Sequence, residues 1–126
     1  MTNRYLFLFL PAYPTLHSSS LVKLEHVANY SLLYTIQGSD PSLKPYLLCS
    51  HLDVVPVEKE KWTVEPFAGQ VANGYLYGRG AIDVKDAVIG ILESMEHLLK
   101  VEKFKPRRTI LIGKRFLELK FKSFLI

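Results

Sequence analysis

Three side chains near the middle of the sequence can bind a metal ion or move a proton. His51 and Asp53 follow an apolar run that begins at Tyr46, and residues i and i+2 of an extended strand point to the same side. A neutral imidazole is a good zinc ligand, and a nearby carboxylate can orient it or hold a reacting water. Asp83 supplies a second carboxylate, on a glycine-containing turn before a helical segment. This pattern predicts one half of a metal-hydrolase site.

Each of these residues also has a simpler structural explanation. Asp83 stands where the N-cap of the following helix is expected, and taken alone it is better explained as a cap. His51 could be a hydrogen-bonded strand histidine, and Asp53 could close a turn. The combination favours a site, because His-x-Asp at a strand end is followed by Gly-Arg-Gly-x-x-Asp-x-Lys at the start of a helix. Gly78 and Gly80 permit a sharp turn that would aim Asp83 into a cleft.

Four neighbouring side chains have less specific roles. Arg79 is expected to form a structural ion pair rather than to clamp a substrate. Lys85 would lie in the first helical turn, where its charge opposes the helix dipole, so a carboxylate partner such as Asp86 is expected. Trp62 and Phe67 could line a substrate entrance or anchor the loop that carries them. The remaining histidines lack ligand-like spacing and are assigned to the surface or to packing: His17, His26 and His97.

The elements that must position the site alternate between strand and helix. Apolar residues recur at helical spacing over residues 84–100, with Glu96 on the polar face. Residues 46–51 and 109–113 are apolar runs typical of buried strands. A strand-helix-strand order predicts an α/β domain with a mainly parallel core, in which sites form beyond the carboxyl ends of the strands. Position 114 is therefore where a further catalytic group is expected.

Shorter segments complete the predicted domain. Residues 30–37 and 46–51 are expected to form a hairpin with a long connection, and Asn73-Gly74 predicts a tight hairpin. Residues 21–27 form a short strand or a turn. The apolar run at residues 5–10 is too short for a signal-peptide core or a membrane span, so a packed helix or strand that stops at Pro11 is expected.

The amino-acid composition limits the classes of protein to which the chain can belong. The chain has 126 residues, 48% of them hydrophobic and 22% charged, as in a globular domain. The net charge of +4 comes from residues 100–126, which carry nine basic and two acidic residues. A solvated face explains this charge better than a nucleic-acid site, so no nucleic-acid partner is predicted. The single cysteine, Cys49, is expected to be a small buried hydrophobe rather than a reactive thiol, and it leaves the compartment open.

Taken together, these motifs resemble those of the di-zinc aminoacylase, carboxypeptidase and desuccinylase group of hydrolases. The resemblance rests on Ser-His-Leu-Asp-Val-Val-Pro at residues 50–56, on Trp62 with Pro66-Phe67, and on Tyr-Gly-Arg-Gly-Ala-Ile-Asp-Val-Lys at residues 77–85. Residues 34–43 and 105–109 are similar to the N-fatty-acyl-amino-acid synthase/hydrolase branch of that group. The resemblance covers roughly residues 3–113.

The resemblance implies a fold and a chemistry. The fold is the N-terminal part of a zinc-peptidase catalytic domain, with a mixed, mainly parallel sheet flanked by helices. His51 would bind one zinc, Asp83 would bridge two zincs, and Asp53 would be the supporting acidic catalytic residue. The implied reaction is amide hydrolysis of an N-acyl amino acid or a peptide, reversible in the branch named above, with a glutamate as general base. Relatives in that branch are secreted.

The resemblance ends after Gly113. The family continues there with a histidine and an acidic run that holds the general base and a zinc ligand, whereas this chain continues Lys114-Arg115, and Glu118 has a different setting. We therefore expect residues 1–113 to be the N-terminal portion of the catalytic domain and residues 114–126 to be a divergent tail, with the lid and dimerisation domain absent. The alternating tail residues could also form an edge strand.

The sequence is compatible with four functional interpretations. The first is a zinc-dependent hydrolase of N-acyl amino acids, and the second is a dipeptidase or carboxypeptidase of the same family. The third is an inactive fragment that lacks the general base and the remaining zinc ligands, because a catalytic zinc usually has three protein ligands. The fourth is a binding module that uses its basic tail on anionic surfaces.

Overall fold

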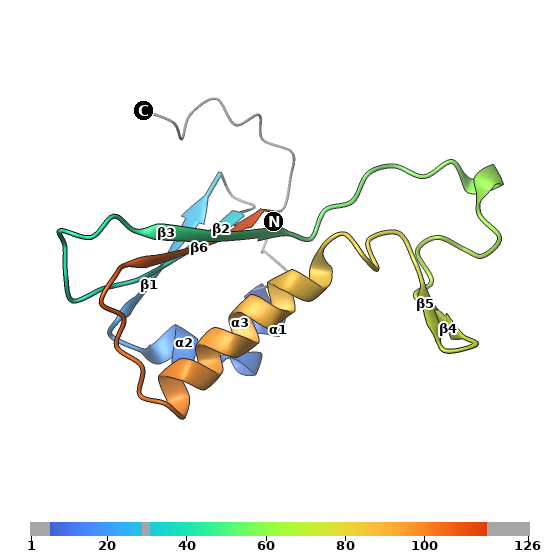
Figure 1. Ribbon diagram of the computed structural model, residues 1–126. Helices are drawn as coiled ribbons and strands as arrows, with labels where there is room; N and C mark the ends of the chain where they lie inside the picture. The colour runs from blue at the N-terminus through green and yellow to red at the C-terminus, as the bar shows by residue number, and fades with distance from the viewer. Residues whose placement is uncertain (1–5, 29–30, 116–126) are drawn as a thin grey trace.

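The computed structural model describes residues 6–28 and 31–115 as an α/β arrangement of one main sheet, three helices and a small hairpin (Figure 1). The α/β class is thus confirmed. In chain order the elements are α1 (Leu6–Ala12), α2 (Pro14–Ser18), β1 (Val22–Val27), β2 (Ser31–Ile36), β3 (Tyr46–His51), the 3₁₀ turn η1 (Lys59–Lys61), β4 (Gln70–Ala72), β5 (Tyr75–Tyr77), α3 (Lys85–Lys100) and β6 (Ile110–Arg115).

The main sheet is mixed and has the strand order β1-β2-β6-β3. β1 with β2 and β2 with β6 are antiparallel, and β3 with β6 is parallel. The predicted mainly parallel core is therefore wrong for the described strands. The predicted hairpin of β2 with β3 is also wrong, because β6 lies between them. Its residues Ile110, Leu111 and Ile112 are apolar on both faces, which suits an interior strand.

The hydrophobic core lies between the sheet and the three helices, which all cover one face (Figure 1). α3 buries a stripe at helical spacing, as its sequence predicts. The buried residues of β2 and β6 alternate along each strand, so one face of each strand meets the helices. The core comprises Phe9, Tyr13, Leu16, Leu32, Tyr34, Ile36, Val88, Leu92, Met95, Leu99, Ile110 and Ile112.

Glu96 departs from its predicted place on the polar face of α3. It is only 8% exposed, and its carboxylate accepts hydrogen bonds from the backbone N–H groups of Thr15 (3.0 Å) and Leu16 (2.7 Å). These N–H groups belong to the first turn of α2, where no intrahelical partner exists for them. Glu96 therefore joins α3 to α2, and the same bonds explain why a carboxylate is buried here.

The prediction for β3 is also wrong in its burial. Leu47 is 52% exposed and Cys49 is exposed, because β3 is an edge strand among the described residues and packs only its alternate side chains against the helices. Leu47 and Cys49 flank Gly113 on the other face, where a Cβ on that glycine would lie 3.5–3.6 Å from their side chains. Cys49 is consequently not the buried hydrophobe that its apolar neighbours suggested.

The long connection from β3 to α3 extends away from the sheet and carries the β4–β5 hairpin (Figure 1). The predicted hairpin is confirmed: Asn73 and Gly74 have φ of 52° and 79°, which a tight type I′ turn requires. At the other end of the chain, α1 continues through Pro11 instead of stopping there. Within residues 6–28 and 31–115 no helix has the length and apolarity needed to cross a membrane. The predicted edge strand of the tail lies outside the described residues.

Candidate metal site

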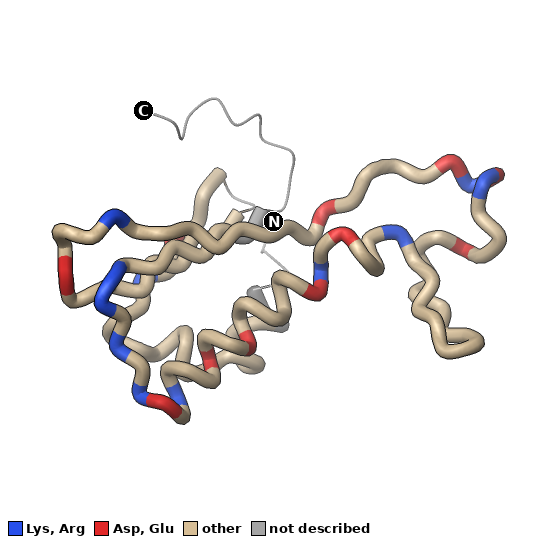
Figure 2. The backbone as a smooth tube through the Cα atoms, in the orientation of Figure 1, with Lys and Arg blue, Asp and Glu red and all other residues tan. Residues whose placement is uncertain are grey.

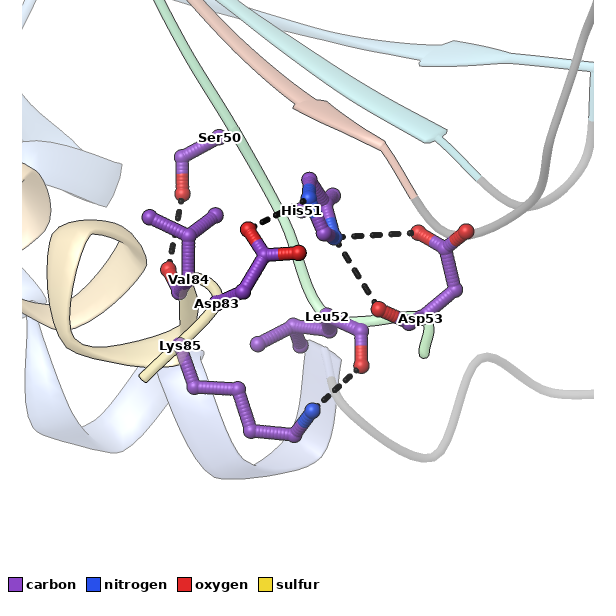
Figure 3. A network of polar contacts seen from close by, with 7 residues as sticks. All are labelled: Ser50, His51, Leu52, Asp53, Asp83, Val84 and Lys85. Atoms are coloured by element: carbon purple, nitrogen blue, oxygen red, sulfur yellow. Dashed lines mark hydrogen bonds and ion pairs between the residues drawn. The ribbon is translucent and has the colours of Figure 1, made fainter. Parts of the chain in front are cut away.

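His51 is the last residue of β3, and its ring faces a carboxylate on each side (Figure 3). Nδ1 lies 3.0 Å from the backbone carbonyl oxygen of Asp53, which can only accept a hydrogen bond, so Nδ1 carries the proton. In the neutral ring Nε2 then presents its lone pair, and this atom lies 3.6 Å from Asp83 Oδ1. The lone pairs of two such acceptors repel each other, and a proton or a cation between them would remove this repulsion.

Asp83 is not the helix cap that its position suggested. α3 begins at Lys85, its N-cap position is held by Val84, and no side chain caps it. The Asp83 side chain is 84% exposed and turns toward His51 (Figure 3). The peptide bond that links Asp83 to Val84 is cis. The structure thus brings together the two residues that the sequence predicted as metal ligands.

Asp53 lies on the opposite side of the imidazole ring. Its Oδ1 is 3.7 Å from His51 Nδ1, and this oxygen is buried without a hydrogen-bond partner among the described residues. A buried acceptor without a donor is costly, and Nδ1 of His51 is the ring nitrogen nearest to this oxygen. The backbone oxygen of Asp53, which the sequence could not single out, makes the shorter contact.

Two cross-links hold the start of α3 against the end of β3 and so place Asp83 beside His51. The Lys85 ammonium group donates to the Leu52 carbonyl oxygen at 2.9 Å, and Ser50 Oγ donates to the Val84 carbonyl oxygen at 3.4 Å (Figure 3). Lys85 forms no ion pair with a carboxylate of residues 6–28 or 31–115, so the expected partner is wrong for this part of the chain. Gly80 has φ of 87°, and a Cβ there would lie 2.5 Å from Lys85 Nζ. Glycine is needed at this position both for the turn and for the passage of the lysine.

Arg79 stacks on an aromatic ring and forms no ion pair with the carboxylates that the structure describes, in place of the expected pair. Its guanidinium carbon lies 5.2 Å from the centre of the Trp62 ring, a cation–π distance. Its backbone N–H donates to the Pro66 carbonyl oxygen at 2.7 Å. Trp62 therefore anchors the loop, whereas Phe67, 60% exposed, makes no comparable ring contact among the described residues.

The donor set fits part of a zinc site. An imidazole nitrogen and a carboxylate oxygen are both zinc donors, and 3.6 Å between them is close to the spacing of two ligands on one ion. The described residues contain no group of three or more His, Cys, Asp or Glu that could hold a metal. Position 114, where a further catalytic group was expected, holds Lys114 beside Ser50 in the sheet register, and Arg115 pairs with His51. Glu118 lies outside the described residues.

The described residues form an α/β arrangement with a mixed sheet, and His51 and Asp83 meet where β3 ends and α3 begins. The chain belongs to peptidase family M20/M25/M40, whose family model matches residues 47–113. Members of this family typically bind zinc. The predicted membership is thereby confirmed, and the matched residues include all three predicted site residues.

Curated relatives agree with the predicted branch. The chain is 54% identical over 102 residues to N-fatty-acyl-amino acid synthase/hydrolase PM20D1 of Mus musculus. The aligned region covers 81% of this chain and 20% of the relative. It is 43% identical over 113 residues to carboxypeptidase S of Saccharomyces cerevisiae, or 86% of this chain and 19% of that protein. The chain therefore spans about a fifth of the length of these relatives.

A solved structure has the same fold. Human carnosine dipeptidase 1 superimposes with a TM-score of 0.56 at 22% identity, covering 88% of this chain and 26% of that chain. The likeness extends over most of the described residues and supports the arrangement of sheet and helices.

Proposed function

We propose that this chain supplies the first part of the catalytic domain of a zinc-dependent hydrolase that cleaves the amide bond of N-acyl amino acids. His51 and Asp83 hold the metal, and Asp53 orients His51. The observation that carries the proposal is the 3.6 Å approach of His51 Nε2 to Asp83 Oδ1, with Nδ1 held by Asp53 on the other side of the ring. The similarity to N-fatty-acyl-amino acid synthase/hydrolases supports an acylated amino acid as the substrate class.

In this proposal the residues around the metal ligands have separate roles. The Asp53 carbonyl oxygen keeps the proton on Nδ1, so Nε2 stays free to bind. Lys85 and Ser50 hold the two ligand-bearing segments together. A bound zinc would acidify a water and polarise the acyl carbonyl. None of these residues is the glutamate general base, which the resemblance implies should follow the position of Gly113. We accordingly assign residues 1–113 to the catalytic domain and residues 114–126 to a divergent tail.

Zinc binding by the purified chain tests the site. We expect zinc to bind the chain in a calorimetric titration, and His51→Ala or Asp83→Ala to weaken the affinity about tenfold or more, because each removes one of only two donors. His26→Ala, an exposed histidine of β1, is the matched control and should leave the affinity unchanged. Equal affinities for wild type and His51→Ala would refute the site.

Activity on the zinc-loaded chain separates the candidate functions. The similarity to carboxypeptidase S supports a second candidate, a peptidase of the same family. Release of free amino acid is measured from a long-chain N-acyl amino acid and from an unmodified dipeptide. Preference for the first substrate supports the acylase, and preference for the second supports the peptidase. A chain that binds zinc and cleaves neither is the inactive fragment.

A further inference from the structure

A second candidate site lies at the opposite end of the main sheet from His51. A cavity of about 330 Å³ is lined by Tyr46, Phe104, Pro106, Arg107, Arg108 and Ile110. Tyr46 and Ile110 are the first residues of β3 and β6 and pair in the parallel register, whereas His51 is the last residue of β3. Five residues of extended strand separate the two sites by roughly 16 Å. The cavity is therefore distinct from the candidate metal site.

The walls of this cavity are apolar and held in place by the backbone. Ile110 belongs to the core, and Phe104 packs against it. The segment that carries the wall is tied on both sides: Phe104 N–H donates to the Leu98 carbonyl oxygen at 3.0 Å, and Ser39 N–H donates to the Pro106 carbonyl oxygen at 3.0 Å. These bonds fix the backbone that carries Phe104 and Pro106, so one side of this open pocket is formed before a ligand binds.

The mouth of the cavity is cationic. Basic residues follow one another along the connection from α3 to β6, and another lies near the start of β3, with acidic residues among them (Figure 2). Arg107 is already paired, since its Nη2 lies 3.0 Å from Asp40 Oδ2. Arg108 is exposed and forms no ion pair with any carboxylate among the described residues. Among the residues that line this pocket, Arg108 thus supplies a cation that a ligand can reach.

Stabilisation of the α3 dipole explains only some of these basic residues. Lys100 ends α3, where a cation stabilises the helix dipole. That effect fades beyond the last helical turn, and Arg107 and Arg108 lie in the segment before β6. Helix stabilisation therefore does not account for two arginines beside an apolar cavity.

We propose that this cavity binds a single-chain amphipathic anion. Its apolar part lies against Tyr46, Phe104 and Ile110, and its carboxylate or phosphate head accepts hydrogen bonds from Arg108, the geometry that a guanidinium group favours. The volume is at the lower end of the range for small-molecule sites. At roughly 30 Å³ per small group it holds about ten non-hydrogen atoms, such as a medium-length acyl chain. This proposal is independent of the proposed amide hydrolysis.

Calorimetric titration of the whole chain with dodecanoate, kept below its critical micelle concentration, tests the proposal. We expect one molecule to bind and Arg108→Glu to weaken binding about tenfold or more, because it removes a charge-assisted hydrogen bond and adds repulsion. Lys61→Glu makes the same change of charge on the distant η1 turn and should leave the affinity within about twofold. Arg108→Gln, which adds no negative charge, should also weaken binding, and circular dichroism checks that each variant is folded.

Further probes identify the part of the ligand that is recognised. Dodecyl phosphate should bind and inorganic phosphate should not, since the head alone leaves the apolar wall empty. Vesicles of equimolar phosphatidylcholine and phosphatidylserine distinguish a bilayer lipid from a free amphiphile, and the proposal expects the free amphiphile to bind in solution without them. The proposal is overturned if dodecanoate fails to bind, if Arg108→Glu binds it as tightly as wild type, or if only vesicles bind.

Discussion

Replacing Glu96 by glutamine should remove much of the link between α3 and α2. The carboxylate accepts two backbone hydrogen bonds, from Thr15 at 3.0 Å and from Leu16 at 2.7 Å. A hydrogen bond to a charged group contributes about 1.5–3 kcal/mol. Glutamine keeps one carbonyl oxygen as an acceptor but directs an NH₂ group at the second N–H. We therefore expect Glu96→Gln to lower the free energy of unfolding by about 2–3 kcal/mol.

The effect should also depend on pH. Burial, the largest single influence, acts to raise the pKa of Glu96, but the hydrogen bonds from Thr15 and Leu16 and the charge of Lys100 outweigh it and hold the pKa below its ordinary value of 4.5. Because the folded-state pKa lies below the unfolded one, the stabilisation is complete above pH 4.5 and is lost as the pH falls through the folded-state pKa. The difference between wild type and Glu96→Gln should shrink accordingly in acid.

Urea unfolding followed by circular dichroism, near neutral pH and again in acid, measures both effects. Glu93→Gln is the matched control, since it removes one exposed charge from the same helix without these hydrogen bonds, and should change stability by no more than about 0.5 kcal/mol. The reasoning is refuted if Glu96→Gln is as stable as Glu93→Gln near neutral pH, or if its deficit persists undiminished in acid.

Four further predictions concern single residues. Gly38→Ala should destabilise the chain by about 2 kcal/mol or more, because its Cβ would lie 2.4–2.6 Å from the backbone of residues 107–109. Gly90→Ala, in the middle of α3 with nothing within 4 Å of a Cβ, should instead stabilise it by about 0.5–1 kcal/mol. Burial, with a smaller contribution from Tyr13, raises the pKa of Tyr34 to about 12, so an ultraviolet titration of Tyr34→Phe should lack a phenolate that ionises near that pH. Arg79→Gln should shift the fluorescence of Trp62, the single tryptophan, because it removes the cation from the ring face.

Each of these has an outcome that contradicts it. Equal stabilities of the two glycine variants would mean that the close approach at Gly38 is absent. A titration of Tyr34→Phe that matches wild type near pH 12 would place the Tyr34 hydroxyl in water. An unchanged emission spectrum in Arg79→Gln would show that the guanidinium group does not lie over Trp62, and Lys61→Gln serves there as the control for an exposed charge on the same loop.

Local patterns predicted the elements that depend on neighbouring residues. The apolar spacing over residues 84–100 predicted α3 within one residue of its observed start, and Asn73-Gly74 predicted the β4–β5 hairpin. The His-x-Asp and Gly-Arg-Gly-x-x-Asp motifs predicted the family, which the family model confirms. Spacing of this kind suffices where the backbone conformation depends on residues only a few positions apart.

Local patterns did not predict hydrogen-bond partners or strand partners that lie far apart in the chain. The partners of Glu96 and Lys85 are backbone groups of residues 15–16 and of Leu52, and no spacing of charged residues marks a backbone group. The pairing of β2 with β6 was missed because a turn signal predicts where a strand ends, not which strand it joins.

The sequence by itself determined the family, the helix α3 and the residue types of the candidate metal site. Only the tertiary structure decided that Asp83 faces His51 instead of capping α3 and that Cys49 is exposed. The physical reason is range. Helix periodicity and turn chemistry act over a few residues, whereas these contacts form only when packing closes the chain from β3 to α3 and inserts β6 beside β3.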